Sequence, residues 1–127
     1  MASRLKAEHE QLLKKAHKAL AAARSLQRSG YSEDAISRAY YAMFHAARAF
    51  LVKRGIFRHK HSAVIAAFGQ VAVKTGLVSS ETHRLLTQSF EARNAADYDA
   101  SWEGTSGDAK EAIEEAARFL NYLERVL

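Results

Sequence analysis

The 127-residue sequence has no cysteine and no proline, and it contains only six glycines. The lack of cysteine excludes disulfides, thiol nucleophiles and cysteine-based zinc sites, and it is typical of proteins from a reducing compartment. We therefore expect a cytoplasmic protein. Because proline is absent and the glycines stand mostly between segments of helical periodicity, the sequence predicts an all-α fold.

Long apolar runs are also missing. No run approaches the roughly 18 residues that a membrane-spanning helix needs, and residues 1–15 contain no apolar signal core. We therefore expect no membrane interaction. The length fits one domain with its own hydrophobic core, so residues 1–127 are predicted to form a single unit.

Charge is distributed unevenly along the chain. Residues 1–60 contain 13 Lys and Arg against 4 Asp and Glu, a net charge of +9, whereas residues 61–127 contain 6 against 10, a net charge of −4. A basic half of this kind favours polyanions such as RNA. The acidic half could equally contact a basic partner or the basic half of a second copy.

Apolar residues recur at helical spacing in five segments. The pattern predicts an up-and-down bundle of four long helices and a shorter third one. A basic loop over residues 56–60 and a loop over 98–107, which contains the only tryptophan, separate some of them. The five helices are expected at about residues 3–28, 32–54, 61–74, 79–96 and 108–127.

Several short signals mark the expected helix ends. Gly30 suits the C-cap of the first helix, and Gly76 is expected to end the third. Ser32 is predicted to be the N-cap of the second helix. The segment Thr105–Asp108 resembles a capping box in which Asp replaces the usual Glu.

The second helix has two chemically different faces. One face is apolar and includes Tyr40, Met43 and Phe44, which we assign to the core. The opposite face would hold Lys and Glu on an ordinary surface helix, but here it offers a phenol, an imidazole and two guanidinium groups. These groups bind phosphate, stack on bases or dock on partners. The candidate binding face consists of Arg38, Tyr41, His45 and Arg48.

The fourth helix ends in a polar group at helical spacing. One interpretation places Arg93, Asn94, Asp97 and Tyr98 in a cluster beside the polar face of the second helix. The alternative is a structural ion pair between Arg93 and Asp97, one turn apart, with Tyr98 packed over it as a lid. Helix geometry alone favours the alternative.

The six histidines do not form a metal-binding pattern, since neither Glu-x-x-His nor His-Glu-x-x-His occurs. We interpret His59 and His61 as solvated or as phosphate contacts, and His9 and His17 as surface residues. No nucleophile-elbow serine and no glycine-rich phosphate loop are present. The sequence therefore predicts neither a metal nor a cofactor.

Four segments of the predicted helices carry a family resemblance. They are Ser37 to Arg48, which contains Tyr40-Tyr41-Ala42-Met43-Phe44-His45; His61-Ser62; Phe68-Gly69; and Phe90-Glu91-Ala92-Arg93 followed by Ala96-Asp97-Tyr98. On these segments the chain resembles a HEPN domain over about residues 12–127, in the small stand-alone prokaryotic subgroup often encoded beside a minimal nucleotidyltransferase. The resemblance implies a homodimeric bundle in which polar residues of the second and fourth helices line a groove.

Many members of this family are metal-independent ribonucleases with an Arg, a polar residue and a His four to six positions after the Arg. Arg93-Asn94 matches the start of that motif, but Asp97 and Tyr98 occupy the place of the His. The resemblance implies that Arg93 would stabilise phosphate charge. His45 could supply the missing imidazole from across the groove. In related members, a tyrosine just after the His is the residue that the nucleotidyltransferase modifies, and Tyr98 holds a comparable place.

Three functions remain open from the sequence. The first is the HEPN half of a toxin–antitoxin-like pair, which binds RNA or nucleotide phosphate and docks a nucleotidyltransferase. The second is an active metal-independent endoribonuclease toxin. The third is a non-catalytic helical adaptor.

Overall fold

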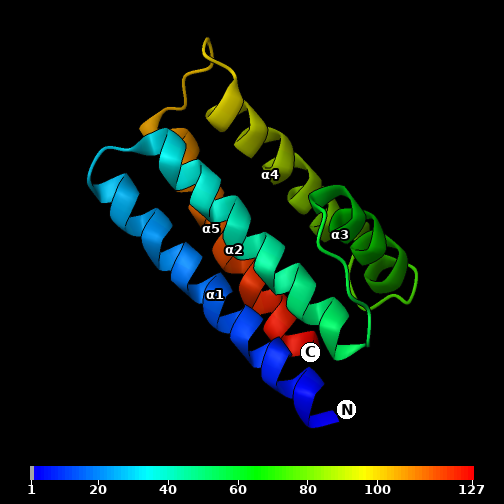
Figure 1. Cartoon of the computed structure of the whole chain (residues 1–127). Coiled ribbons are helices and arrows are strands. Elements are labelled where there is room, and N and C mark those ends of the chain that lie inside the picture. The colour runs from blue at the N-terminus through cyan, green and yellow to red at the C-terminus, as the bar shows by residue number, and fades with distance from the viewer. Residues whose placement is uncertain (1) are drawn as a thin grey trace.

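The computed structural model describes residues 2–127, and within them it is all-α, with no strand (Figure 1). The prediction of an all-α bundle of long helices with a shorter third one is confirmed. The elements are α1 (Ala2–Arg28), α2 (Ser32–Lys53), α3 (His61–Phe68), a π-helical segment η1 (Gly69–Val73), α4 (Ser80–Tyr98) and α5 (Ser106–Val126).

Helix α2 lies at the centre of the bundle and packs against α1, α3, α4 and α5. Figure 1 shows α1 and α2 side by side as antiparallel helices, with α4 on the other side of α2 and both termini at one end of the bundle. Alanines line the buried sides of both helices, which allows close approach because the side chains at a helix contact set its interaxial distance. The buried alanines are Ala16, Ala19 and Ala23 in α1 and Ala35, Ala39, Ala42, Ala46, Ala47 and Ala49 in α2.

Aromatic side chains join three of the helices in the core. The ring centroid of Phe68 in α3 lies 5.4 Å from that of Phe50 in α2 and 5.7 Å from that of Phe119 in α5. All three side chains are fully buried. Such edge-to-face and tilted pairs stabilise a core beyond the area they bury, so the short α3 is fixed to the bundle.

The segment η1, which follows α3, contacts α4 through its first residue, a glycine. A Cβ atom at Gly69 would lie 2.8 Å from Nε2 of His83, so any side chain there would collide with that ring. The His83 ring in turn lies 3.0 Å, Nε2 to O, from the backbone carbonyl of Ile65. Gly69 therefore lets α4 approach α3 closely.

Most of the predicted helix ends are confirmed. Gly30 has φ +86° and Gly76 has φ +77°, a left-handed conformation that favours glycine. Thr105 and Asp108 form the predicted capping box. The prediction for Ser32 is wrong, because Ser32 is already helical and Tyr31 is the N-cap, without a side-chain cap bond.

The surface position predicted for His9 is also wrong. His9 is only 9% exposed, and its Nδ1 lies 2.8 Å from the carbonyl oxygen of Ala49. Because α1 packs along α2, this side of α1 is buried and its imidazole finds a backbone partner. None of the helices in the described part combines the length and apolarity that a bilayer crossing requires.

Candidate functional site

Helix α2 places the four predicted residues on one face, called here the α2 polar face: Arg38, Tyr41, His45 and Arg48. The guanidinium carbon of Arg38 lies 4.5 Å from the centroid of the Tyr41 ring, and the Tyr41 and His45 rings are 6.0 Å apart. At the far end, Arg48 Nη2 donates to Nδ1 of His59 over 3.3 Å. The helical spacing therefore produces a continuous row of polar groups, as predicted.

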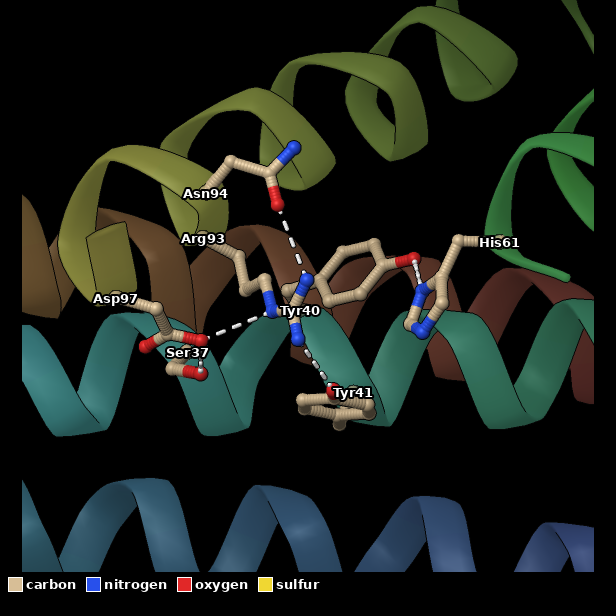
Figure 2. Close-up of polar contacts among 7 residues, drawn as sticks. All are labelled: Ser37, Tyr40, Tyr41, His61, Arg93, Asn94 and Asp97. Carbon is tan, nitrogen blue, oxygen red and sulfur yellow. Dashed lines mark hydrogen bonds and ion pairs between the residues drawn. The ribbon is translucent and has the colours of Figure 1, made fainter. Parts of the chain in front are cut away.

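Helix α4 adds an arginine to this row. Arg93 Nη2 donates to the hydroxyl of Tyr41 over 2.8 Å, and Arg93 Nη1 donates to Oδ1 of Asn94 over 3.0 Å. Arg93 Nε lies 3.0 Å from Oδ2 of Asp97, and that same oxygen accepts from the Ser37 hydroxyl over 3.3 Å. Figure 2 shows these side chains gathered between α2 and α4.

Both interpretations of the end of α4 are therefore partly right. The ion pair between Arg93 and Asp97 is present, and the same Arg93 also contacts Tyr41 on the α2 polar face. Tyr98 does not form a lid, because 76% of the residue is exposed although its ring centroid lies 5.5 Å from the Arg93 guanidinium carbon. The last turn of α4 leaves that ring facing solvent.

His45 sits in a half-buried and electropositive setting. Burial and, after it, the positive charges of Lys15, Arg48 and Arg38 lower its pKa to about 4. Its Nδ1 and the Nε of Arg48 are buried without a hydrogen-bond partner in the part of the chain that the structure describes. His45 is thus a neutral imidazole at pH 7, beside a guanidinium with an unused donor.

The charge of Arg93 affects the imidazole of His61 and not that of His45. Burial and, after it, the charge of Arg93 lower the pKa of His61. Its Nδ1 lies 2.6 Å from the hydroxyl of Tyr40, and its ring stacks on Phe44 with centroids 4.3 Å apart. Of the two interpretations of His61, the solvated residue is wrong, because the basic loop returns this first residue of α3 onto α2. The phosphate contact stays a prediction.

Sequence reasoning missed the polar roles of Tyr40 and His61. Tyr40 belongs to the core as predicted, being only 1% exposed. A buried tyrosine usually has a hydrogen-bond partner for its hydroxyl. That rule predicts a polar residue beside Tyr40, although it does not say which one. The partner lies 21 positions along the chain, and helical periodicity cannot relate residues across a loop.

The site is suited to anions. Among residues 2–127, Arg38 and Arg48 make no ion pair with an acidic side chain, and only Asp97 neutralises Arg93. Guanidinium groups, a phenol and imidazoles are the usual protein donors to phosphate oxygens. No group of three or more His, Cys, Asp or Glu side chains that could hold a metal ion occurs in the described part of the chain.

Comparisons with known proteins agree with this architecture. The HEPN domain model matches residues 9–126. A Methanocaldococcus jannaschii protein named "Putative toxin MJ0142" is 34% identical over 127 residues, which cover 100% of this chain and 86% of the relative. A second protein of that organism, "Putative toxin MJ0605", is 33% identical over 123 residues, which cover 97% of this chain and 91% of the relative. A Thermotoga maritima "UPF0332 protein" is 33% identical over 114 residues, which cover 90% of this chain and 86% of the relative.

Proposed function

Because the chain belongs to the HEPN family, we propose that it is the HEPN half of a toxin–antitoxin-like pair. In this proposal, the α2 polar face and the end of α4 bind phosphate groups of RNA or of a nucleotide. A nucleotidyltransferase is the partner of the pair, and two copies of the chain form a homodimer. The toxin-like part of the proposal is supported by the names of two relatives.

One observation supports phosphate binding most strongly. Arg48 Nε and His45 Nδ1 are buried on the α2 polar face without hydrogen-bond partners. Buried polar atoms are nearly always paired in folded proteins, and an orphan costs about 1–3 kcal/mol. A ligand that displaced the side chains covering these two atoms would place a phosphate oxygen to accept from Arg48 Nε and a hydroxyl to donate to His45 Nδ1. The same face holds more positive than negative charge.

The proposed partner acts on Tyr98. This residue is the last of α4, is largely exposed, and lies close to Arg93. In the modification, the Tyr98 oxygen attacks the α-phosphorus of a nucleoside triphosphate, pyrophosphate leaves, and the phenol proton passes to a base of the partner enzyme. The new phosphodiester would lie next to Arg93 and would compete for it with an incoming RNA phosphate.

A second candidate function is an endoribonuclease. It is favoured by the position of His61, whose pKa responds to the charge of Arg93. Cleavage by internal attack of the 2′-hydroxyl needs a group that moves the proton and a cation for the phosphate. His61 and Arg93 would be the two groups.

The proposal is tested by expression in cells with and without the candidate nucleotidyltransferase. Wild type, Tyr98→Phe and Arg93→Ala are compared by growth, by the intact mass of the purified protein, and by the integrity of total RNA on a gel. Tyr98→Phe is the matched control because it removes only the acceptor oxygen.

We expect wild type alone to slow growth and Arg93→Ala to relieve the effect. With the partner present, wild type should gain the mass of one or more nucleotidyl groups, and Tyr98→Phe should gain none. Fragmented RNA in wild type but not in Arg93→Ala would establish the ribonuclease. Normal growth together with an unchanged mass would contradict the toxin–antitoxin proposal and leave a helical adaptor.

A further inference from the structure

The buried Tyr40 and the partly exposed His61 form a polar pair beside the α2 polar face. Within residues 2–127, the Tyr40 hydroxyl has one hydrogen-bond partner, His61 Nδ1, at 2.6 Å. Burial raises the pKa of Tyr40 far above neutrality, so the hydroxyl keeps its proton and donates it to Nδ1. A neutral ring whose Nδ1 accepts a hydrogen bond has its own proton on Nε2.

The His61 ring is also fixed in position. It stacks on Phe44 at 4.3 Å and on Phe90 at 5.7 Å between ring centroids. The titratable and charged groups that face it are Tyr40, Tyr41 and His45 from α2 and Arg93 from α4. These surroundings include cations but no carboxylate near enough to raise its pKa, so the neutral ring with a proton on Nε2 is the stable form.

Two further donors lie beside this ring. The Tyr41 hydroxyl accepts from Arg93 Nη2, and its own proton has no acceptor in the described part of the chain. The Tyr41 and His61 rings stand edge to face with centroids 5.7 Å apart. Figure 2 shows the Tyr41 side chain over α2, the Arg93 guanidinium reaching it from α4, and the His61 side chain extending towards them from the start of α3.

We propose that Tyr41, His61 and Arg93 together bind one phosphate group, and that Tyr40 is a positioning residue that keeps the His61 proton on Nε2. The inference rests on the proposed function and adds the site at which a single phosphate of the RNA backbone is held. His61 acts as a neutral hydrogen-bond donor, Tyr41 as a second donor, and Arg93 supplies the charge.

Phosphate fits this donor set better than a carboxylate. The three donors come from three different helices and approach from different directions, which suits the tetrahedral oxygens of a phosphate rather than a planar pair. The Arg38 guanidinium carbon lies 4.5 Å from the centroid of the Tyr41 ring and adds positive charge without a hydrogen bond to the hydroxyl. Asp97 neutralises the charge of Arg93 but not that of Arg38.

The binding test uses a fluorescein-labelled single-stranded RNA octamer and follows its anisotropy. The variant Tyr40→Phe/His61→Phe replaces both partners of the hydrogen bond by apolar rings of similar shape, which leaves no orphaned group in the core and preserves the fold. The matched control is His17→Phe, which makes the same change at an exposed position of α1. Competition with inorganic phosphate asks whether the phosphate group alone occupies the site.

We expect the double variant to bind the octamer about tenfold more weakly, which is the effect of losing one well-placed hydrogen bond to a charged group. His17→Phe should bind within about twofold of wild type. Inorganic phosphate should displace the octamer from wild type at a lower concentration than from the double variant.

The role of Tyr40 has its own readout. In Tyr40→Phe, the hydrogen bond that stabilises neutral His61 is lost, so a pH titration of the His61 ring by NMR should show a higher pKa than in wild type. A merely structural tyrosine would leave that titration unchanged.

The outcomes separate the two proposals. If wild type does not bind the octamer, the proposed RNA-binding function fails and the phosphate site fails with it. If wild type binds and the double variant binds equally well, the proposed function stands and the phosphate site is wrong. An unchanged His61 titration in Tyr40→Phe overturns the positioning role alone.

Discussion

At the scale of single residues, His45 and His61 show how burial and neighbouring cations keep an imidazole neutral. Among residues 2–127 neither ring has a carboxylate partner, and both have guanidinium groups nearby. A neutral histidine can present a proton on one nitrogen and a lone pair on the other. The site therefore combines permanent positive charge on its arginines with uncharged donors and acceptors on its histidines.

Protonation of His45 should couple stability to pH. Its pKa is about 4 in the folded protein and about 6.5 in an unfolded chain, so between these values the unfolded state binds more protons. Stability is then greatest above pH 6.5 and falls as the pH decreases towards 4. In His45→Gln, the decrease in Tm from pH 7.5 to pH 5.0 should be smaller than in wild type.

His61 acts in the same direction, so the variant should retain part of the pH dependence. Thermal unfolding followed by circular dichroism at both pH values measures the difference. If His45→Gln loses as much Tm as wild type over this range, His45 is not neutral in the folded protein.

The sequence predicted the local contacts of the site but not the distant ones. Arg93 and Asp97 are one helical turn apart, and helical spacing is enough to expect their ion pair. Tyr40 and His61 meet only because the loop over residues 56–60 returns α3 onto α2. The position of Arg93 beside the α2 polar face was one of two interpretations of the sequence, and only the packing of α4 decides between them. No periodicity in a single sequence encodes such contacts.

At the scale of the helices, the structure separates two capping signals that look alike in the sequence. The Thr105 side chain accepts from the backbone N–H of Asp108, and the Asp108 side chain accepts from the backbone N–H of Thr105. Ser32 has no such bond because the helix already begins at that residue. A capping serine is effective only when it stands immediately before the first helical residue.

Substitution at these two positions tests the assignment. Thr105→Ala should reduce the free energy of unfolding by about 1 kcal/mol, because α5 loses its N-cap bond. Ser32→Ala should change it by less than about 0.5 kcal/mol, as for most surface substitutions. Urea denaturation of both variants beside wild type provides the measurement. An equal loss in the two variants would contradict the assigned helix starts.

The helix boundaries illustrate what periodicity can and cannot predict. Apolar spacing and glycine positions placed four of the five helices within a few residues of their observed ends, since both signals are local. The third, predicted over residues 61–74, is α-helical only to Phe68 and continues as η1 to Val73. The π-helical segment after α3 was not predicted, and it coincides with Gly69, where the His83 ring of another helix occupies the space of a side chain. The need for glycine at position 69 comes from packing against His83. Its only trace in the sequence is a single glycine, which does not by itself indicate a π-helical segment.

At the scale of the whole molecule, the uneven charge of the chain becomes a spatial arrangement. The basic first half forms α1, α2 and the loop after it, and the acidic second half includes α4 and α5. Lys15 from α1 and Arg93 from α4 add to the arginines of the α2 polar face. The fold thus gathers cations from three helices at one surface, where a polyanion would release several counterions.

The central claim is that this surface, and not the general positive charge of the protein, binds RNA. The most direct test compares two double variants with the same change in charge by octamer anisotropy over a range of salt concentrations. Arg38→Ala/Arg48→Ala removes two cations from the α2 polar face. Arg24→Ala/Arg28→Ala removes two from the groove between α1 and α5. Circular dichroism verifies that both remain folded.

The account predicts that the first variant binds at least tenfold more weakly and that its salt dependence becomes shallower by about one to two in the slope of log K against log salt. The second should stay within about threefold of wild type. Equal losses in the two variants, or no loss in the first, would contradict the account.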